Sequence, residues 1–290
     1  MIHRARDSHH AAGAKIETED PSSPMALPSD LISLIPELVR LAAEAGRLVF
    51  GLSAGGLEVR SKQDLSPVTN ADLRAEEMLL IGLERLLPGV PVLAEESAAR
   101  GIVPDVGNAF VVLDPLDGTK EYVAGRAEYT VNIGLVENGR PRIGIICVPA
   151  LGRTYWGVAG GQAARAIHPP GGLAAPDSFA PISTRPLANP PVALTSRGHN
   201  DAVTEAFLDT VGAADRQRLG SAYTFALVAE GSADLYARFV GTMEWDTAAG
   251  EALLTAAGGT VLSPEGRPLD YGKVASSFVN GPFIAWGRAP

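Results

Sequence analysis

The stretch Val111-Val-Leu-Asp-Pro-Leu-Asp-Gly-Thr-Lys-Glu-Tyr122 decides how this chain is interpreted. Its apolar beginning, residues 110–113, predicts a buried strand. Asp114 and Asp117 follow, and Pro115 between them fixes its own φ and has no N–H to donate, so we expect the strand to turn there. Two carboxylates at a strand end repel each other unless a cation lies between them. Hard divalent cations prefer carboxylate and carbonyl oxygens.

The residues that follow the two acids extend this interpretation. Gly118 and Thr119 stand at the start of a possible short helix. Backbone amides at such a position are suited to hold a phosphate beside the metal. The alternative is a polar turn in which both aspartates occupy turn positions. Further acids along the chain favour the metal site over the turn.

Length and composition limit the class of protein. The 290 residues suffice for one large domain or two ordinary ones, and 46% apolar with 20% charged residues predicts a sizeable core. The net charge of −9 argues against binding to a nucleic-acid backbone, although a small anion can still bind at a cationic or metal-filled site. Cys147 is the only cysteine, which predicts a buried thiol and fits a reducing, cytoplasmic location. No apolar run approaches the ~18 residues of a membrane span.

Composition also divides the chain. Residues 1–28 lack an apolar period and the apolar centre of a secretory signal, so we expect a disordered tail, in which Met25 is an alternative start. We expect an N-terminal α+β domain with the metal site at 29–155 and a C-terminal α/β domain at 156–290. The Pro-, Gly- and Ala-rich region 150–190 is the basis for this boundary.

Apolar periodicity predicts the elements of both halves. In the first half we expect helices at 31–50 and 72–87, a loop at 62–69, and strands at 57–60, 91–94, 129–137, 142–148 and 154–158. Asn138-Gly139 predicts a hairpin turn. In the second half we expect helices at 201–211, 221–230 and 245–257. The strands expected there are 192–196, 217–219, 234–239 and 260–262, and 260–262 is the last strand of the chain. Such alternation indicates a layered α/β arrangement.

The segment Gly51-Leu-Ser-Ala-Gly55 matches the G-x-S-x-G pattern of serine hydrolases, with Ser53 as the nucleophile. That motif requires a strained strand-to-helix turn. Here it follows a predicted helix and precedes a predicted strand, so a helix end and loop is the better interpretation. A serine esterase would stay active in EDTA and lose activity on Ser53→Ala.

Five acids lie at predicted element ends: Glu95, Glu96, Asp114, Asp117 and Asp246. Each one alone has a structural explanation, as a residue of a solvated turn or of a first helical turn. Asp72 has the same explanation near the start of its helix. What the individual positions do not explain is their grouping in motifs.

Three of these motifs, in this order, resemble the inositol monophosphatase superfamily of metal-dependent, lithium-sensitive phosphatases. They are Ala94-Glu-Glu-Ser97, Asp114-Pro-Leu-Asp-Gly-Thr119 and Trp245-Asp-Thr-Ala-Ala-Gly250. The resemblance covers roughly residues 30–287. It implies an α/β layered sandwich, α-β-α-β-α, with mixed sheets, like that of inositol monophosphatase and fructose-1,6-bisphosphatase.

Within the superfamily the chain looks most like the CysQ branch of 3′(2′),5′-bisphosphate nucleotidases. Four segments carry this likeness: Lys120-Glu-Tyr122, Ser66-Pro-Val-Thr-Asn-Ala-Asp-Leu73, Thr195-Ser-Arg-Gly-His199 and Arg238-Phe239. Two positions depart from the branch. Gly198 replaces the serine of its Ser-Arg-Ser-His loop, and Thr224 replaces a lysine that meets phosphate, which would lower affinity for a second phosphate or shift the substrate.

The resemblance implies a metal site and a mechanism with two or three Mg²⁺ ions. Glu95, Asp114 and the carbonyl of Leu116 would hold one ion, while Asp114, Asp117 and Asp246 would hold a second. Thr119 with Asp72 would orient and deprotonate the attacking water, and Glu96 would assist through bound water. The implied substrate contacts are Glu95, Leu116, Asp117, Gly118, Thr119, Arg197, His199, Ser221, Arg238 and Asp246.

The function expected from the resemblance is hydrolysis of the 3′-phosphate of adenosine 3′,5′-bisphosphate, and of its sulfated form, in the cytoplasm. The alternative is an inositol monophosphatase or another small sugar or polyol phosphatase. A third interpretation is a non-catalytic protein that senses nucleotide or metal and releases no phosphate. The expected partner is a small nucleotide or sugar phosphate, with no nucleic-acid polymer and no membrane span.

Overall fold

The computed structural model describes Leu27 and residues 30–53, 55, 57–62, 66–199 and 201–289. The expected disordered tail at 1–28 therefore lies, apart from Leu27, outside the described residues. Among the helices of the described part, none is long and apolar enough to cross a membrane.

A seven-stranded sheet forms the first β layer, in the order β3-β4-β5-β6-β7-β8-β9. Its strands are β3 (Val92–Ala94), β4 (Ala109–Asp117), β5 (Thr130–Glu137), β6 (Arg140–Val148), β7 (Arg153–Val158), β8 (Ala163–Ile167) and β9 (Ala180–Pro181). The β3–β4 pair is parallel and the other pairs are antiparallel, so the sheet is mixed, as predicted. The predicted hairpin forms between β5 and β6, where Asn138 and Gly139 both have positive φ.

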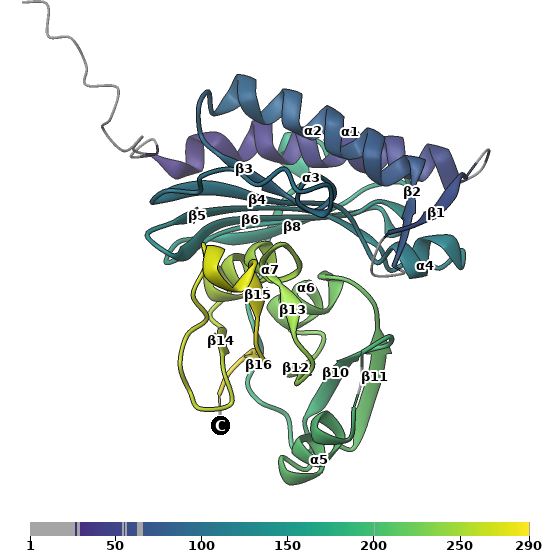
Figure 1. Ribbon diagram of the computed structural model, residues 1–290. Helices are drawn as coiled ribbons and strands as arrows, with labels where there is room; N and C mark the ends of the chain where they lie inside the picture. Colours follow the sequence, from purple (N-terminus) through teal and green to yellow (C-terminus); the bar gives the residue numbers. More distant parts are fainter. Residues whose placement is uncertain are drawn as a thin grey trace, which may run out of the picture.

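Two helices cover the outer face of this sheet (Figure 1). The first, α1 (Ile35–Ser53), follows the 3₁₀ turn η1 (Leu31–Leu34), and the second, α2 (Asn70–Leu86), packs beside it. The α2 N-terminus has a capping box in which Thr69 and Asp72 exchange hydrogen bonds, so Asp72 is fixed in the first helical turn. This local rule explains why the sequence prediction of the helix start was accurate.

The G-x-S-x-G segment lacks the geometry of a serine hydrolase. Gly51 to Ser53 form the last turn of α1, and the Ser53 hydroxyl donates to the Phe50 carbonyl at 2.7 Å. The required strand-to-helix turn is absent from these residues, which confirms the interpretation as a helix end.

Two more helices lie on the other face of the large sheet, between it and a smaller one (Figure 1). They are α6 (Tyr223–Ala229) and α7 (Glu244–Ala256). Helix α7 packs closely on the sheet because β6 has a glycine beneath it: a Cβ at Gly144 would lie 2.0 Å from the Ala249 carbonyl oxygen. This contact fixes the position of the α7 N-terminus, where Asp246 lies.

The second β layer has five strands in the order β11-β10-β12-β16-β14, and α5 (Ala202–Thr210) lies beyond it (Figure 1). Its strands are β10 (Val192–Ser196), β11 (Asp215–Leu219), β12 (Leu235–Arg238), β14 (Thr260–Leu262) and β16 (Phe283–Trp286). The layers therefore alternate α-β-α-β-α, which confirms the predicted sandwich with mixed sheets.

Several element predictions were wrong in detail. The expected loop at 62–69 contains β2 (Pro67–Thr69), which pairs antiparallel with β1 (Val59–Ser61). The expected final strand, β14, is an edge strand, because β16 inserts between it and β12. The short ribbon β13 (Thr242–Met243) with β15 (Val279–Asn280) was also missed, as were β8 and β9. All are short or follow irregular segments, where apolar periodicity has too few residues to register.

The predicted boundary at 155/156 falls within β7. The large sheet continues to Pro181, and the smaller sheet begins at Val192. The passage between the two sheets therefore lies in the Pro- and Ala-rich segment between these residues, at the end of the region 150–190 from which the boundary was drawn.

Candidate active site

Asp114 and Asp117 both belong to the last part of β4, which ends at Asp117, as expected for acids at a strand end. Residues three apart on a regular strand point to opposite faces. The register between β4 and β5 shifts between these two residues, as at a β-bulge, around Pro115. Because of this irregularity, both carboxylates point toward the same place although both residues belong to β4.

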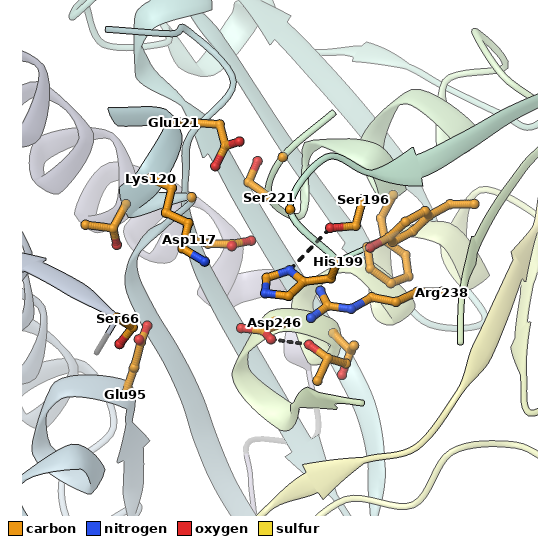
Figure 2. A pocket seen from close by; sticks show the side chains of 18 of the residues that line it. Ser66, Glu95, Asp117, Lys120, Glu121, Ser196, His199, Ser221, Arg238 and Asp246 are labelled. Atoms are coloured by element: carbon orange, nitrogen blue, oxygen red, sulfur yellow. Dashed lines mark hydrogen bonds between the residues drawn. The ribbon is translucent and has the colours of Figure 1, made fainter. Parts of the chain in front are cut away.

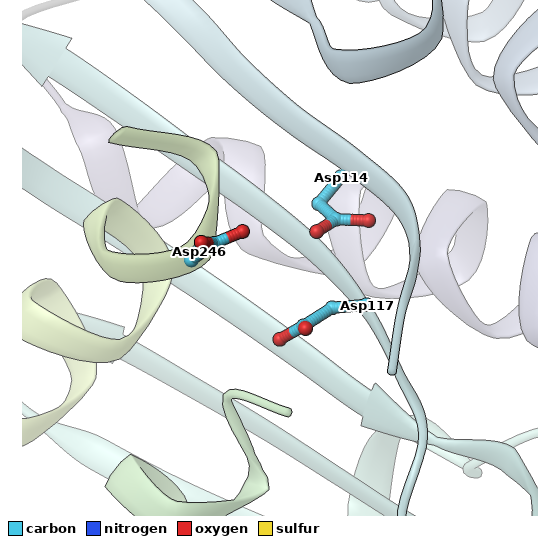
Figure 3. Close-up of side chains that lie close together, drawn as sticks. All are labelled: Asp114, Asp117 and Asp246. Atoms are coloured by element: carbon cyan, nitrogen blue, oxygen red, sulfur yellow. The ribbon is translucent and has the colours of Figure 1, made fainter. Parts of the chain in front are cut away.

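A third carboxylate reaches this place from the opposite side. Asp246 lies in the first turn of α7, where it accepts hydrogen bonds from the Met243 amide at 3.0 Å and from the Thr242 hydroxyl. Asp114, Asp117 and Asp246 each present an oxygen within 4.8 Å of the other two (Figure 3). Two residues of β4 and one residue of α7, which is distant in sequence, thus form one cluster, as expected from the sequence.

Burial and mutual repulsion disfavour the ionised forms of these three carboxylates. Burial raises the pKa of Asp114 well above its ordinary value, and Glu95, Asp117 and Asp246 raise it further. Burial and then Asp246 raise the pKa of Asp117 to about 7, although the Ala222 amide acts against the shift. These carboxylates fit a hard divalent cation, because such an ion prefers oxygen ligands and its charge would offset the repulsion.

Glu95 and Glu96 occupy the first turn of α3 (Glu95–Ala99), where a solvated turn was the simpler expectation. Glu95 lines the same cavity as Asp117 and Asp246 but is not one of the three clustered carboxylates. Burial raises the pKa of Glu95 to about 8 while Lys62 acts against the shift. Glu95 therefore lies beside the cluster rather than within it.

Lys62 was missed in the sequence, where it belonged to a predicted loop. Its ammonium lies 2.6 Å from Glu95 and 2.7 Å from Glu96, so the β1–β2 ribbon supplies a cation to this acidic wall. Glu76 was missed too: from α2 it accepts the Glu96 amide at 2.8 Å and the Ser97 hydroxyl at 2.7 Å. Neither residue belongs to a motif, and only the tertiary structure brings them here.

Thr119 and Asp72 meet as predicted. The Thr119 hydroxyl lies 3.1 Å from Asp72 Oδ1 and 3.1 Å from the Leu116 carbonyl oxygen. Burial raises the pKa of Asp72, although the hydroxyl and amide of Thr69 act against the shift. The pair therefore combines a hydroxyl that can bind water with a buried carboxyl that can take up a proton.

A cavity of about 190 Å³ is lined by three of these acids, Glu95, Asp117 and Asp246. Figure 2 shows His199 and Arg238 facing Glu95 from across the cavity, whereas Lys120 lies beside Asp117 on the acidic side. Burial lowers the pKa of His199, and Arg238 lowers it further. Arg238 donates from Nη2 to the Gly241 carbonyl at 3.3 Å, while its buried Nε has no hydrogen-bond partner among the described residues. Of the remaining predicted contacts, Gly118, Thr119 and Ser221 also line the cavity, whereas Leu116 does not.

One predicted contact, Arg197, and the departing residue Thr224 both lie away from the cavity lining. Arg197 does not line the cavity: its guanidinium binds Glu121 and Glu128 instead. Thr224, the residue in place of the expected lysine, is buried and its hydroxyl donates to the Ser221 carbonyl at 3.0 Å. Neither side chain is placed to contact a molecule in the cavity.

Two donors to Asp117 were not found in the sequence. Asn132, opposite Asp114 on β5, donates to Asp117 Oδ2 at 3.2 Å, and the Ala222 amide donates to the same oxygen at 2.5 Å. Asn132 is part of an apolar strand and its own Oδ1 has no partner within the described structure. An isolated polar residue in such a run is the one sequence signal that points to it.

The chain is similar to several known proteins. The model of the inositol monophosphatase family matches residues 30–283. The 3′(2′),5′-bisphosphate nucleotidase CysQ of Escherichia coli K12 is 38% identical over 252 residues, which are 86% of this chain and 98% of that protein. The crystal structure of CysQ from Bacteroides thetaiotaomicron superposes with a TM-score of 0.74 at 31% identity, covering 90% of this chain and 99% of the other. A histidinol-phosphatase from Streptomyces coelicolor is 34% identical over 219 residues, 73% of this chain and 79% of that protein.

Proposed function

The chain belongs to the inositol monophosphatase family of phosphatases, and on that premise we propose that it hydrolyses the 3′-phosphate of adenosine 3′,5′-bisphosphate and of its sulfated form. The observation that carries the proposal is the two-sided cavity. Carboxylates line one wall together with Lys120, while His199 and Arg238 lie on the other. A bisphosphate needs both: a metal-binding wall for the phosphate that is cleaved and cations for the one that is retained.

The acidic wall fits Mg²⁺. Asp114, Asp117 and Asp246 would hold one ion, and Glu95 with Asp114 and the Leu116 carbonyl would hold another. Few protein ligands for each ion is the expected pattern, because Mg²⁺ keeps several waters. When bound, Mg²⁺ lowers the pKa of a coordinated water and offsets charge on phosphoryl oxygens.

The chain's own residues would handle the proton and the phosphate charge. Thr119 accepts a hydrogen bond from the attacking water and passes its own proton toward Asp72, to which it already donates. Glu96 assists through a bound water. The amides of Gly118 and Thr119 are expected to donate to the phosphoryl oxygens as their charge increases.

The basic wall would select the nucleotide. Arg238 has an unpartnered buried Nε among the described residues, and His199 and Ser221 lie on the same side of the cavity. A planar guanidinium suits a phosphate or a ribose oxygen. The lone buried thiol, Cys147, fits a protein of the reducing cytoplasm.

An inositol monophosphatase or another polyol phosphatase is the second candidate. The observation in its favour is Thr224, which stands where a phosphate-binding lysine was expected and points away from the cavity. The similarity to a histidinol-phosphatase also places an amino-alcohol phosphate among the substrates to be tested.

The test is kcat/KM with Mg²⁺ titrated, measured on adenosine 3′,5′-bisphosphate, inositol 1-phosphate, histidinol phosphate and fructose 1,6-bisphosphate. We expect the nucleotide to be preferred, and activity to vanish in EDTA. Turnover of inositol phosphate far above that of the nucleotide would overturn the nucleotidase assignment. Phosphate release from none of the substrates would favour a binding protein.

A further inference from the structure

The guanidinium of Arg197 is held away from the cavity by three acceptors. Its Nη1 lies 3.4 Å from Glu121 Oε1, and its Nη2 lies 3.1 Å from Glu128 Oε1 and 3.0 Å from the Arg218 carbonyl oxygen. The Glu121 side chain is 10% exposed and that of Arg197 27%. Turning this guanidinium toward a substrate is unfavourable, because the turn would break its ion pairs with both carboxylates and leave the largely buried Glu121 with only Arg126, at 4.0 Å.

Glu121 also packs against the segment that contains Gly220. A Cβ at Gly220 would lie 2.5 Å from the carboxyl carbon of Glu121, so the chain passes directly against that carboxylate. The next residue, Ser221, has φ of 61°, a left-handed conformation that a non-glycine residue adopts only when its surroundings hold it. After it, the Ala222 amide donates to Asp117 at 2.5 Å.

These contacts join three segments that carry cavity residues. Glu121 follows Lys120, Arg197 precedes His199 by two positions, and Gly220 precedes Ser221. The first segment continues from β4 of the large sheet, whereas the other two follow β10 and β11 of the small sheet. The pair thus connects the acidic half of the site to its substrate-facing half.

We propose that Glu121 and Arg197 form a positioning pair, in which Arg197, itself outside the cavity lining, acts through the cavity-lining Glu121 to fix the loops of His199 and Ser221 relative to Lys120 and the acidic cluster. The inference rests on the proposed phosphatase function and corrects the expectation that Arg197 contacts the nucleotide. Loss of the pair loosens the substrate side of the cavity and leaves the carboxylates of the metal site in place. It should therefore raise KM much more than it lowers kcat.

A double-mutant cycle tests this with Glu121→Gln, Arg197→Met and the combination. We expect each single variant to raise KM for adenosine 3′,5′-bisphosphate about 10-fold, and the double variant to be no worse than the worse single, because contacting partners are non-additive. Mg²⁺ affinity, measured by calorimetry, should change less than about 2-fold. Arg197→Lys, which keeps the charge but not the fork, should give an intermediate KM and guards against loss of folding in the methionine variant.

The matched control is Arg216→Met. Arg216 has the same side-chain exposure of 27% and pairs with Glu205 and Asp209 on the outer side of the small sheet, away from the cavity. Its loss should leave KM unchanged. Additive effects of Glu121→Gln and Arg197→Met, or a wild-type KM in Glu121→Gln, would overturn the positioning pair and indicate direct contact by Arg197. If wild type does not hydrolyse the nucleotide, the proposed substrate fails, and the cycle run on the best substrate of the panel still decides the pair.

Discussion

Two buried aspartates of this chain, Asp234 and Asp114, have opposite surroundings. Asp234 receives two hydrogen bonds from Arg185, at 2.8 and 2.7 Å, and further bonds from the amides of Val192 and Ala188. Burial raises the pKa of Asp234, but the Arg185 guanidinium and the amides outweigh burial and hold the pKa below its ordinary value. The negative charge of Asp234 is therefore balanced by groups of the protein itself.

Asp114 has the opposite environment. It accepts the Leu116 amide at 3.0 Å, and its charged neighbours are the carboxylates of Asp117, Asp246 and Glu95. The difference teaches that burial alone does not identify a functional acid. An acid whose partners are complete stabilises the fold, whereas a group of buried acids with too few cations to balance it indicates a ligand that the protein binds.

The largest expected effect comes from Asp114→Asn. With Mg²⁺ and the best substrate we expect kcat to fall by about 10³-fold or more, because a central metal ligand and its charge are lost. In EDTA at pH 8 the variant should unfold at a higher temperature than wild type, since one repelling charge is gone. Wild-type kcat in this variant would contradict the metal assignment.

The same substitution at the paired acid should act on stability instead. We expect Asp234→Asn to lower the free energy of unfolding by about 2–3 kcal/mol, somewhat less than for a fully buried pair because Arg185 remains partly solvated. Urea denaturation measures this loss, and kcat per folded molecule should stay at the wild-type value. Equal effects of the two substitutions on activity would remove the distinction between the two acids.

Lys62→Met removes the cation that the chain itself places beside Glu95 and Glu96. In EDTA we expect the free energy of unfolding to fall by about 2 kcal/mol, because two largely buried carboxylates lose their shared partner. In saturating Mg²⁺ the loss should be smaller, since a divalent ion restores positive charge to this wall. Denaturation with and without metal gives both values, and an equal loss in the two buffers would separate Lys62 from the metal site.

A smaller effect should follow from pH. The pKa values of Asp117 and Glu95 are raised to about 7 and about 8, so the folded state holds protons that the unfolded chain releases near pH 4. Stability present at low pH is therefore lost as pH rises through 7 and 8. In EDTA the melting temperature should fall by a few degrees between pH 5.5 and 8.5. The rise in melting temperature on adding Mg²⁺ should grow over the same range, because ligands must lose protons to bind. A flat profile without metal would contradict the raised pKa values.

Much of the fold could be predicted because its signals are local. The Asn138-Gly139 turn, the start of α2 with Asp72 in its first turn, and the strand β10 all depend on residues adjacent in sequence. The position of β16 could not, because four apolar residues after an irregular segment do not reveal where they will pair. The sheet places them between β12 and β14 for reasons of tertiary packing.

The candidate site divides in the same way. Motif residues such as Asp114, Asp117 and Asp246 converge as expected, whereas Lys62 comes from a ribbon that looked like a loop. Arg197 shows the complementary error: its motif pointed to the substrate, but its side chain is bound to Glu121. A sequence indicates which residues belong to a site more readily than what each of them contacts.

The most direct test of the central claim is anomalous scattering from crystals soaked in Mn²⁺, which replaces Mg²⁺ on oxygen ligands. We expect a bound cation to offset the repulsion among the acids of β4 and α7. A strong peak within coordination distance of Asp114, Asp117 and Asp246 together is the predicted result. Ordered crystals with these side chains unchanged and no manganese among them would contradict it.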